Sequence, residues 1–72
     1  MTIHQDDIRQ QVGEMIREAR RSKGLTQKEV ADVLNVSEGT YSRYESGQAN
    51  LSLLTINKIV KAIGLNLKMS LS

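Results

Sequence analysis

The chain has 72 residues, a formal net charge of +2 and no cysteine, so it forms one small domain at most and neither disulfides nor thiolate metal sites. A chain of this length buries only about 60% of the surface of its unfolded form, which makes a second subunit a natural source of stability. The charge is mildly basic and does not by itself establish a nucleic-acid partner, because a basic run is also typical of a solvated helix face.

Several classes of protein and site are disfavoured by the residue pattern. No apolar run is long enough to cross a membrane, and no signal peptide is visible, so we expect a cytoplasmic, nucleoid-associated protein without a membrane partner. The single histidine, His4, lies in a polar stretch without other ligand residues, so we expect no metal and no cofactor. No nucleophile–base pair, carboxylate dyad or phosphate-binding loop is present, which predicts no catalytic residue and no enzyme.

The first predicted helix begins at Asp6 or Asp7 and ends at Ser22. Acidic residues suit a helix start, and Gly24 suits the left-handed position after a helix end. The residues that recur at helical spacing as one apolar stripe are Ile8, Val12, Met15, Ile16 and Ala19. Gly13, in mid-helix, is either a mild cost or a point of close packing.

The second predicted helix begins after Thr26, which forms an S/T-x-x-E capping box with Glu29. It continues through QKEVADVL and ends at Asn35, a residue that tolerates the left-handed conformation of a tight turn. Small Ala31 falls where two helices would cross most closely. The residues expected to clamp this helix to the next one are Val30, Leu34, Val36, Tyr41 and Tyr44.

The third predicted helix follows at once, with Ser37 as its N-cap and Gly47 at its end. Two short helices joined by a three-residue turn are the outline of a helix-turn-helix. An ordinary helical bundle would also account for the apolar positions. It would not account for a small residue at the crossing together with a turn residue at Asn35.

The fourth predicted helix begins near Ser52 and ends at Ile63, before Gly64. The residues expected to face the core are Leu53, Ile56, Ile59, Val60 and Ile63. The remaining LNLKMSLS changes to a period of two, which predicts a β-strand with one apolar side, formed by Leu65, Leu67, Met69 and Leu71. The sequence therefore predicts an all-α, four-helix domain over residues 1–64 and a short C-terminal dimerisation strand over residues 65–72.

The stretch GLTQKEVADVLNVSEGTYSRYESGQANLSLLTINKIVKAIGL resembles the lambda-repressor-like, Cro/XRE-type helix-turn-helix DNA-binding family. The resemblance covers about residues 10–65 and rests on LTQ at 25–27, the Ala31 and turn pattern, YSRYESG at 41–47 and AIGL at 62–65. It implies that the third helix enters the major groove of double-stranded DNA. Many members of this family carry a long polar residue where this chain has Gly39.

The resemblance also assigns roles to individual residues. The residues expected to meet base edges are Ser37, Glu38, Gly39, Thr40, Ser42 and Arg43. The residues expected to contact the DNA backbone are Gln27, Lys28, Ser46 and Asn50. Arg20 and Glu45 match a structural ion pair of the family. For Arg43, the alternative is an exposed, solvated arginine.

A lone strand would leave its backbone hydrogen-bonding groups unpaired, so we expect two copies of residues 65–72 to pair in a homodimer; the alternative is a frayed tail. This layout is similar to HipB-type antitoxins, in which a dimer binds its operator and holds a toxin. The leading hypothesis is a transcriptional repressor that binds a palindromic operator, either as the antitoxin of a toxin partner or as a stand-alone regulator. The alternative is an interaction module that has lost specific DNA binding.

Overall fold

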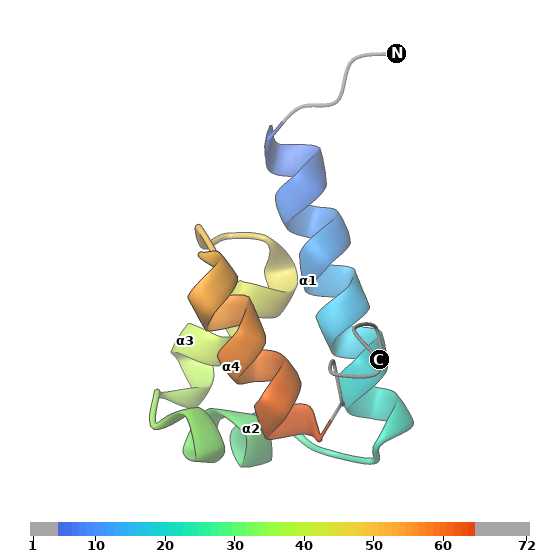
Figure 1. The fold of residues 1–72 in the computed structure, drawn as a ribbon, viewed down its shortest axis with the longest axis vertical. Coiled ribbons are helices and arrows are strands. Elements are labelled where there is room, and N and C mark those ends of the chain that lie inside the picture. The colour runs from blue at the N-terminus through green and yellow to red at the C-terminus, as the bar shows by residue number, and fades with distance from the viewer. Residues whose placement is uncertain (1–4, 65–72) are drawn as a thin grey trace, which may run out of the picture.

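The structure, a computed structural model, describes residues 5–64, which form an all-α arrangement (Figure 1). The helices are α1 (Gln5–Ser22), α2 (Gln27–Leu34), α3 (Glu38–Ser46) and α4 (Leu53–Ile63). This confirms the predicted all-α fold of four helices, the first of which begins one residue earlier than expected. The predicted strand and its apolar residues Leu65, Leu67, Met69 and Leu71 lie outside the described residues.

The long helix α1 lies along one side of the domain and extends beyond the other three helices at its N-terminal end (Figure 1). It packs against α3 and α4, and α2 packs against the same two helices. Consequently α3 is held from two sides, by α1 and by α2.

Short-range side-chain contacts fix the helix ends as the sequence predicted. The Thr26 hydroxyl accepts a hydrogen bond from the Glu29 backbone N–H (3.0 Å), and the Glu29 carboxylate accepts one from the Thr26 backbone N–H (2.8 Å). Helix α2 ends at Asn35, which adopts the left-handed conformation with φ of 62°. Ser37 then caps α3 by accepting from the Thr40 backbone N–H. The turn between α2 and α3 is therefore determined by local chemistry.

The core lies between the four helices and consists of Ile16, Val30, Ala31, Tyr41, Ile59 and Ile63. Ala31 is fully buried, in agreement with its predicted place at a close helix crossing. The Tyr41 and Tyr44 rings meet edge to face with centroids 6.0 Å apart. Such an aromatic pair supports α3, whose own sequence contains a glycine and is a weak helix former.

Three residues of the predicted apolar helix faces are exposed. Met15 is 70% exposed because it lies at the open edge of the space between α1 and α4. Leu53 is 86% exposed because it is the first residue of α4. Ile8, in the first turn of α1, is 49% exposed. Helical spacing predicted which residues of α1 and α4 form an apolar stripe, but not which of those residues other helices cover.

Gly13 is a point of close approach between α1 and α3. A Cβ atom added at this residue would lie 2.9 Å from the Tyr44 carbonyl oxygen, 2.8 Å from the Glu45 carbonyl carbon and still closer to the Glu45 carbonyl oxygen. Backbone atoms cannot move aside as the end of a flexible side chain can. Of the two readings of Gly13 that the sequence left open, the structure therefore selects close packing.

Among residues 5–64, no helix combines the length and the apolar character that a membrane span requires.

Candidate nucleic-acid interface

Helix α3 has two faces of different character. Its inner face carries Tyr41 and Glu45, which are buried, and Tyr44, which is partly buried. At 100° per residue, Gly39, Arg43 and Ser46 fall on the opposite side and Ser42 lies beside them, while Glu38 is the first residue of the helix. Glu38, Gly39, Arg43 and Ser46 are exposed, and Ser42 is partly exposed. The helix therefore presents a polar outer surface while its other side is anchored in the domain.

The polar residues of the outer surface differ in how firmly they are held. The Ser37 hydroxyl donates a hydrogen bond to Thr40 Oγ1 (2.8 Å), and the Ser46 hydroxyl donates one to the Arg43 carbonyl oxygen (3.2 Å). The Arg43 guanidinium has no hydrogen bond or ion pair with any residue of the described range. Arg43 is therefore the cation of α3 that can turn toward a ligand without breaking an existing contact.

The carboxylate of Glu45 connects three helices at the base of this surface. Arg20 Nε lies 2.6 Å from Glu45 Oε2, and Arg20 Nη2 donates to Glu45 Oε1 (3.1 Å). Gln27 Nε2 donates to the same Oε1 (3.0 Å), and Arg17 Nε lies 3.6 Å from it. We call these four residues the Glu45 network. It joins α1, the first residue of α2 and the last turn of α3.

Two further contacts extend the Glu45 network to the backbone. Arg20 Nη1 donates to the Leu25 carbonyl oxygen (2.8 Å), and Arg17 Nη2 donates to the Glu45 carbonyl oxygen (3.4 Å). Arg20 and Glu45 are almost completely buried, with exposed fractions of 8% and 1%. A bidentate arginine–carboxylate pair has a defined geometry. The network therefore fixes the position of α3 relative to the N-terminus of α2.

The pKa values of the Glu45 network follow from burial and hydrogen bonding. Burial is the largest single influence on the pKa of Glu45 and would raise it, but the hydrogen bonds from neighbouring side chains, that from Arg20 first, together with the charge of Arg20 hold the pKa below its usual value. The hydrogen bond to Glu45 raises the pKa of Arg20. Burial raises the pKa of the neighbouring Tyr41 hydroxyl, which remains neutral. The pair is thus fully ionised at neutral pH.

This arrangement predicts acid sensitivity. The folded-state pKa of Glu45 lies below the unfolded value of about 4.3, so its contribution to stability is present above about pH 5 and is lost as the pH falls through the folded-state pKa. We expect the free energy of unfolding, measured with urea, to stay constant from about pH 7 to about pH 5 and to decrease at lower pH. Glu45→Gln should be less stable at neutral pH and show a smaller fall in acid. An equally steep fall in that variant would mean that other carboxylates cause it.

The residues predicted to contact the DNA backbone lie at the start of α2 (Gln27 and Lys28), at the end of α3 (Ser46) and in the loop between α3 and α4 (Asn50). Gln27 is partly buried, and its bond to Glu45 uses one of the two N–H groups of its amide, so the other can donate outward. Lys28 Nζ forms an exposed ion pair with Asp32 (3.1 Å). Asn50 is exposed and lines a hollow of about 330 Å³ together with Leu51, Ile8 and Arg9.

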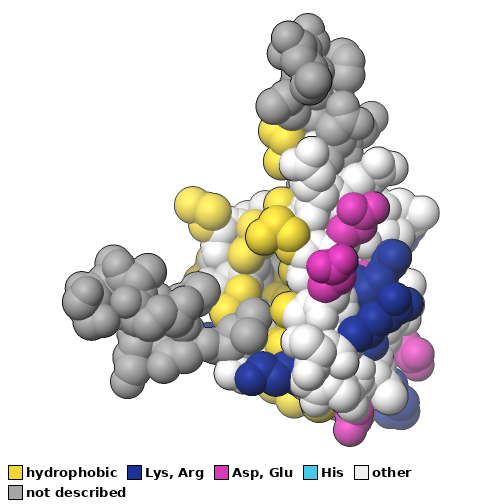
Figure 2. All heavy atoms as spheres, turned by 90° about the vertical axis from the view of Figure 1, so that its right-hand side faces the viewer, with side chains coloured by type: hydrophobic (Ala, Val, Ile, Leu, Met, Phe, Trp, Pro, Cys, Tyr) yellow, Lys and Arg dark blue, Asp and Glu magenta, His cyan; other side chains and the backbone are white. Residues whose placement is uncertain are grey.

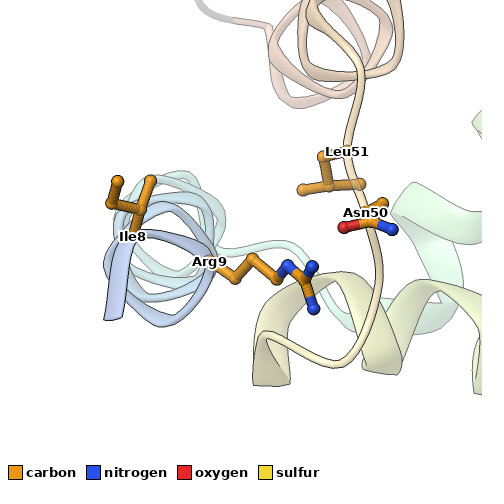
Figure 3. A pocket seen from close by; sticks show the side chains of 4 residues that line it. All are labelled: Ile8, Arg9, Asn50 and Leu51. Atoms are coloured by element: carbon orange, nitrogen blue, oxygen red, sulfur yellow. The ribbon is translucent and has the colours of Figure 1, made fainter. Parts of the chain in front are cut away.

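Arg9 is a basic residue near Asn50 to which the sequence analysis gave no role. Its side chain extends from α1 toward the loop between α3 and α4, next to Asn50, whereas Ile8 points away from that loop (Figure 3). A spacing of four places Arg9, Gly13 and Arg17 on one face of α1, and Gly13 and Arg17 both contact the end of α3. This spacing was the signal in the sequence that could have identified Arg9.

Within residues 5–64, no group of acidic, histidine or cysteine side chains could hold a metal.

Comparison with known proteins gives matches along most of the chain. A family model described as helix-turn-helix matches residues 16–68. Endothelial differentiation-related factor 1 of Homo sapiens is 41% identical over 66 residues, which are 92% of this chain and 45% of that protein. The SPbeta prophage-derived uncharacterized HTH-type transcriptional regulator YonR of Bacillus subtilis (strain 168) is 35% identical over 54 residues, covering 75% of this chain and 50% of YonR.

Multiprotein-bridging factor 1 of Debaryomyces hansenii is 35% identical over 57 residues, which are 79% of this chain and 38% of that protein. The chain thus spans about half the length or less of the curated relatives that it matches.

Proposed function

Because the chain belongs to the Cro/XRE-type helix-turn-helix family, we propose that it is a sequence-specific DNA-binding transcriptional regulator whose helix α3 reads the major groove. One observation carries the proposal: α3 is anchored by the Glu45 network on its inner side, while Arg43 on its outer side has no partner within the described residues. An anchored helix with an uncommitted arginine suits direct readout, since the helix angle sets which bases the side chain reaches.

Each residue of the outer surface has a chemical role in this proposal. Arg43 binds a guanine through two hydrogen bonds, and Glu38 accepts one from a cytosine amino group. Gly39 allows close approach of the α3 backbone, while Ser37, Thr40 and Ser42 contact neighbouring base edges or a thymine methyl group. Phosphates are held by the four residues predicted to contact the DNA backbone, Gln27, Lys28, Ser46 and Asn50. Gln27 then bonds a phosphate and Glu45 at once, which couples the backbone contact to the position of α3.

The finer function that we propose is repression by a homodimer on a palindromic operator, with half-sites about 34–36 Å apart or a multiple of that spacing. Residues 1–64 form the DNA-binding domain and residues 65–72 the dimerisation segment. An antitoxin that represses its own gene and binds a toxin protein is the subtype that the similarity of the sequence to HipB-type antitoxins suggests. The name of YonR, an HTH-type transcriptional regulator, supports the regulatory role.

A second candidate is a module that joins other proteins and makes no specific DNA contact. The observation that favours it is the name of the Debaryomyces relative, Multiprotein-bridging factor 1, which describes bridging between proteins. The two candidates differ in sequence discrimination, since phosphate attraction alone gives binding that is equal for all sequences and strongly dependent on salt.

The experiment that separates them is a fluorescence-anisotropy titration of the chain with duplex DNA from upstream of its own gene and with a scrambled duplex, each at low and high salt. We expect the upstream duplex to bind about 10³-fold or more tightly, with the difference retained at high salt. Equal curves that weaken together with salt would contradict specific regulation at this site and favour the bridging module.

Within that assay, Arg43→Ala tests the direct readout. Loss of a bidentate contact to guanine should weaken binding to the operator by about 5- to 150-fold, corresponding to about 1–3 kcal/mol, and reduce discrimination against the scrambled duplex. Lys61→Ala is the charge-matched control, because Lys61 is an exposed cation in the last turn of α4. Discrimination that survives in Arg43→Ala, or is lost equally in both variants, would remove Arg43 from the reading surface.

A further inference from the structure

Between α1 and α4 lies a hollow of about 280 Å³ whose lining is entirely apolar. Val12, Met15 and Ala19 border it on α1, and Ile56, Val60 and Ile63 border it on α4. We call this hollow the α1–α4 groove. Figure 2 looks onto α1 and shows charged side chains along one side of the molecule and hydrophobic side chains gathered on the other. Since all of its lining residues belong to α1 and α4, the groove is distinct from the polar outer surface of α3.

The two rims of the groove have the pattern of helix faces that pack against a third element. On each helix the rim residues recur at intervals of three or four, which is the spacing of one helix face. Among the described residues nothing packs over this face at Met15, which is 70% exposed. Covering this apolar surface with further apolar side chains would be favourable, because it would remove the surface from water.

The sequence that follows α4 has the chemistry to fill the groove. Ile63 is itself a rim residue, and Gly64 ends the helix in the left-handed conformation with φ of 92°, so Leu65 follows directly at this end of the groove. From Leu65 onward, apolar residues alternate with Asn66, Lys68 and Ser70. An extended segment with this alternation places all of its apolar side chains on one side.

We propose that the α1–α4 groove is the binding site for residues 65–72 of the same chain, with Leu65, Leu67 and Met69 inserted between the two helices. Lys68 then faces solvent. Tethering within two residues of the rim gives this segment a high effective concentration at the groove, which a second copy lacks. The inference is compatible with the proposed dimer, because a segment bound in the groove still has backbone hydrogen-bonding groups along one edge that can pair with the same segment of a second copy. It does not rest on DNA binding.

The lengths of the two parts agree. The groove extends from Val12 to Ala19 on α1 and from Ile56 to Ile63 on α4. Each range advances by seven residues, and at about 1.5 Å per residue the groove is about 10 Å long. From Leu65 to Met69, four residues at about 3.3 Å each span about 13 Å. Three successive apolar residues of the segment therefore cover the groove, and Leu67 falls at the level of Met15.

Engineered cysteines test the proposal directly, because the chain contains none of its own. The variant Met15→Cys/Leu67→Cys places one thiol on the rim and one on the inserted side of the segment. Met15→Cys/Lys68→Cys is the matched control, since position 68 is tethered equally but lies on the opposite side of an extended segment. Both full-length variants are oxidised with glutathione, and the products are separated by intact mass and on a non-reducing gel.

We expect an intramolecular disulfide in the Leu67→Cys variant that forms at least tenfold faster than in the Lys68→Cys control. Equal rates in the two variants would show that the segment does not bind the groove with its apolar side. Covalent dimers in place of intramolecular disulfides would show that the groove takes the segment of a second copy, and would overturn the proposal that it binds its own. Since no DNA is present, these outcomes are independent of whether the chain binds an operator.

Discussion

Arg20→Ala is expected to lower the free energy of unfolding by about 3–5 kcal/mol, which for a domain of this size is most of its stability. The Glu45 carboxylate is 1% exposed and forms two short contacts with Arg20. After the substitution it would remain buried with only Gln27 and the half-exposed Arg17 as partners. Part of the loss is therefore the cost of an undercompensated buried charge, in addition to the loss of two hydrogen bonds.

Urea unfolding followed by circular dichroism measures this loss. Lys28→Ala is the control, because Lys28 also forms an ion pair with an acid, but both partners are exposed and such pairs contribute under about 1 kcal/mol. If Arg20→Ala fails to fold, the double variant Arg20→Met/Glu45→Leu provides a second measurement. It removes both charges and should recover much of the stability. Similar losses for Arg20→Ala and Lys28→Ala would contradict the assigned role of the Glu45 network.

Gly13→Ala is expected to destabilise the domain by about 1–3 kcal/mol or more, although helix propensity alone would make it stabilising by about 1 kcal/mol. The added Cβ atom would collide with the carbonyl groups of Tyr44 and Glu45. Relief of that collision requires α1 and α3 to separate, which would also stretch the contacts between Arg20 and Glu45. The sign of the change therefore decides between propensity and packing.

The same substitution at Gly39 is the matched control. Gly39 is exposed in α3, and the nearest atom to an added Cβ is Ser37 Oγ at 4.0 Å, so nothing opposes the gain in helix propensity. We expect Gly39→Ala to raise the urea midpoint and Gly13→Ala to lower it. If both variants were stabilised, the close approach of α1 to the end of α3 would be wrong.

The predicted elements agree with the structure where the determining interactions are local. The capping box of Thr26 and Glu29, the left-handed Asn35 and the N-cap Ser37 each act within four residues of chain, so residue type and spacing were sufficient. Local signals of this kind placed all four helices and the turn between α2 and α3. The same signals could not predict which helices pack together.

Features that depend on helix crossings were not accessible from spacing. Arg20 and Glu45 are 25 residues apart, and only the resemblance to a family suggested that they form a pair. The bond from Gln27 to the same carboxylate and the collision at Gly13 depend on the distance between helix axes, which no periodicity encodes. The exposure of Met15 has the same origin, because an apolar stripe does not reveal where its cover ends.

The two-sided character of α3 has a consequence for how this protein can evolve. Glu38, Ser42 and Arg43 make no contribution to the packing of the inner face. Tyr41, Tyr44 and Glu45 form that face. A lineage can therefore exchange the outer side chains one at a time, at a cost in folding close to that of ordinary surface substitutions. Foldability and recognition are thereby separated within a single nine-residue helix, and new preferences can be explored by random drift without loss of the scaffold.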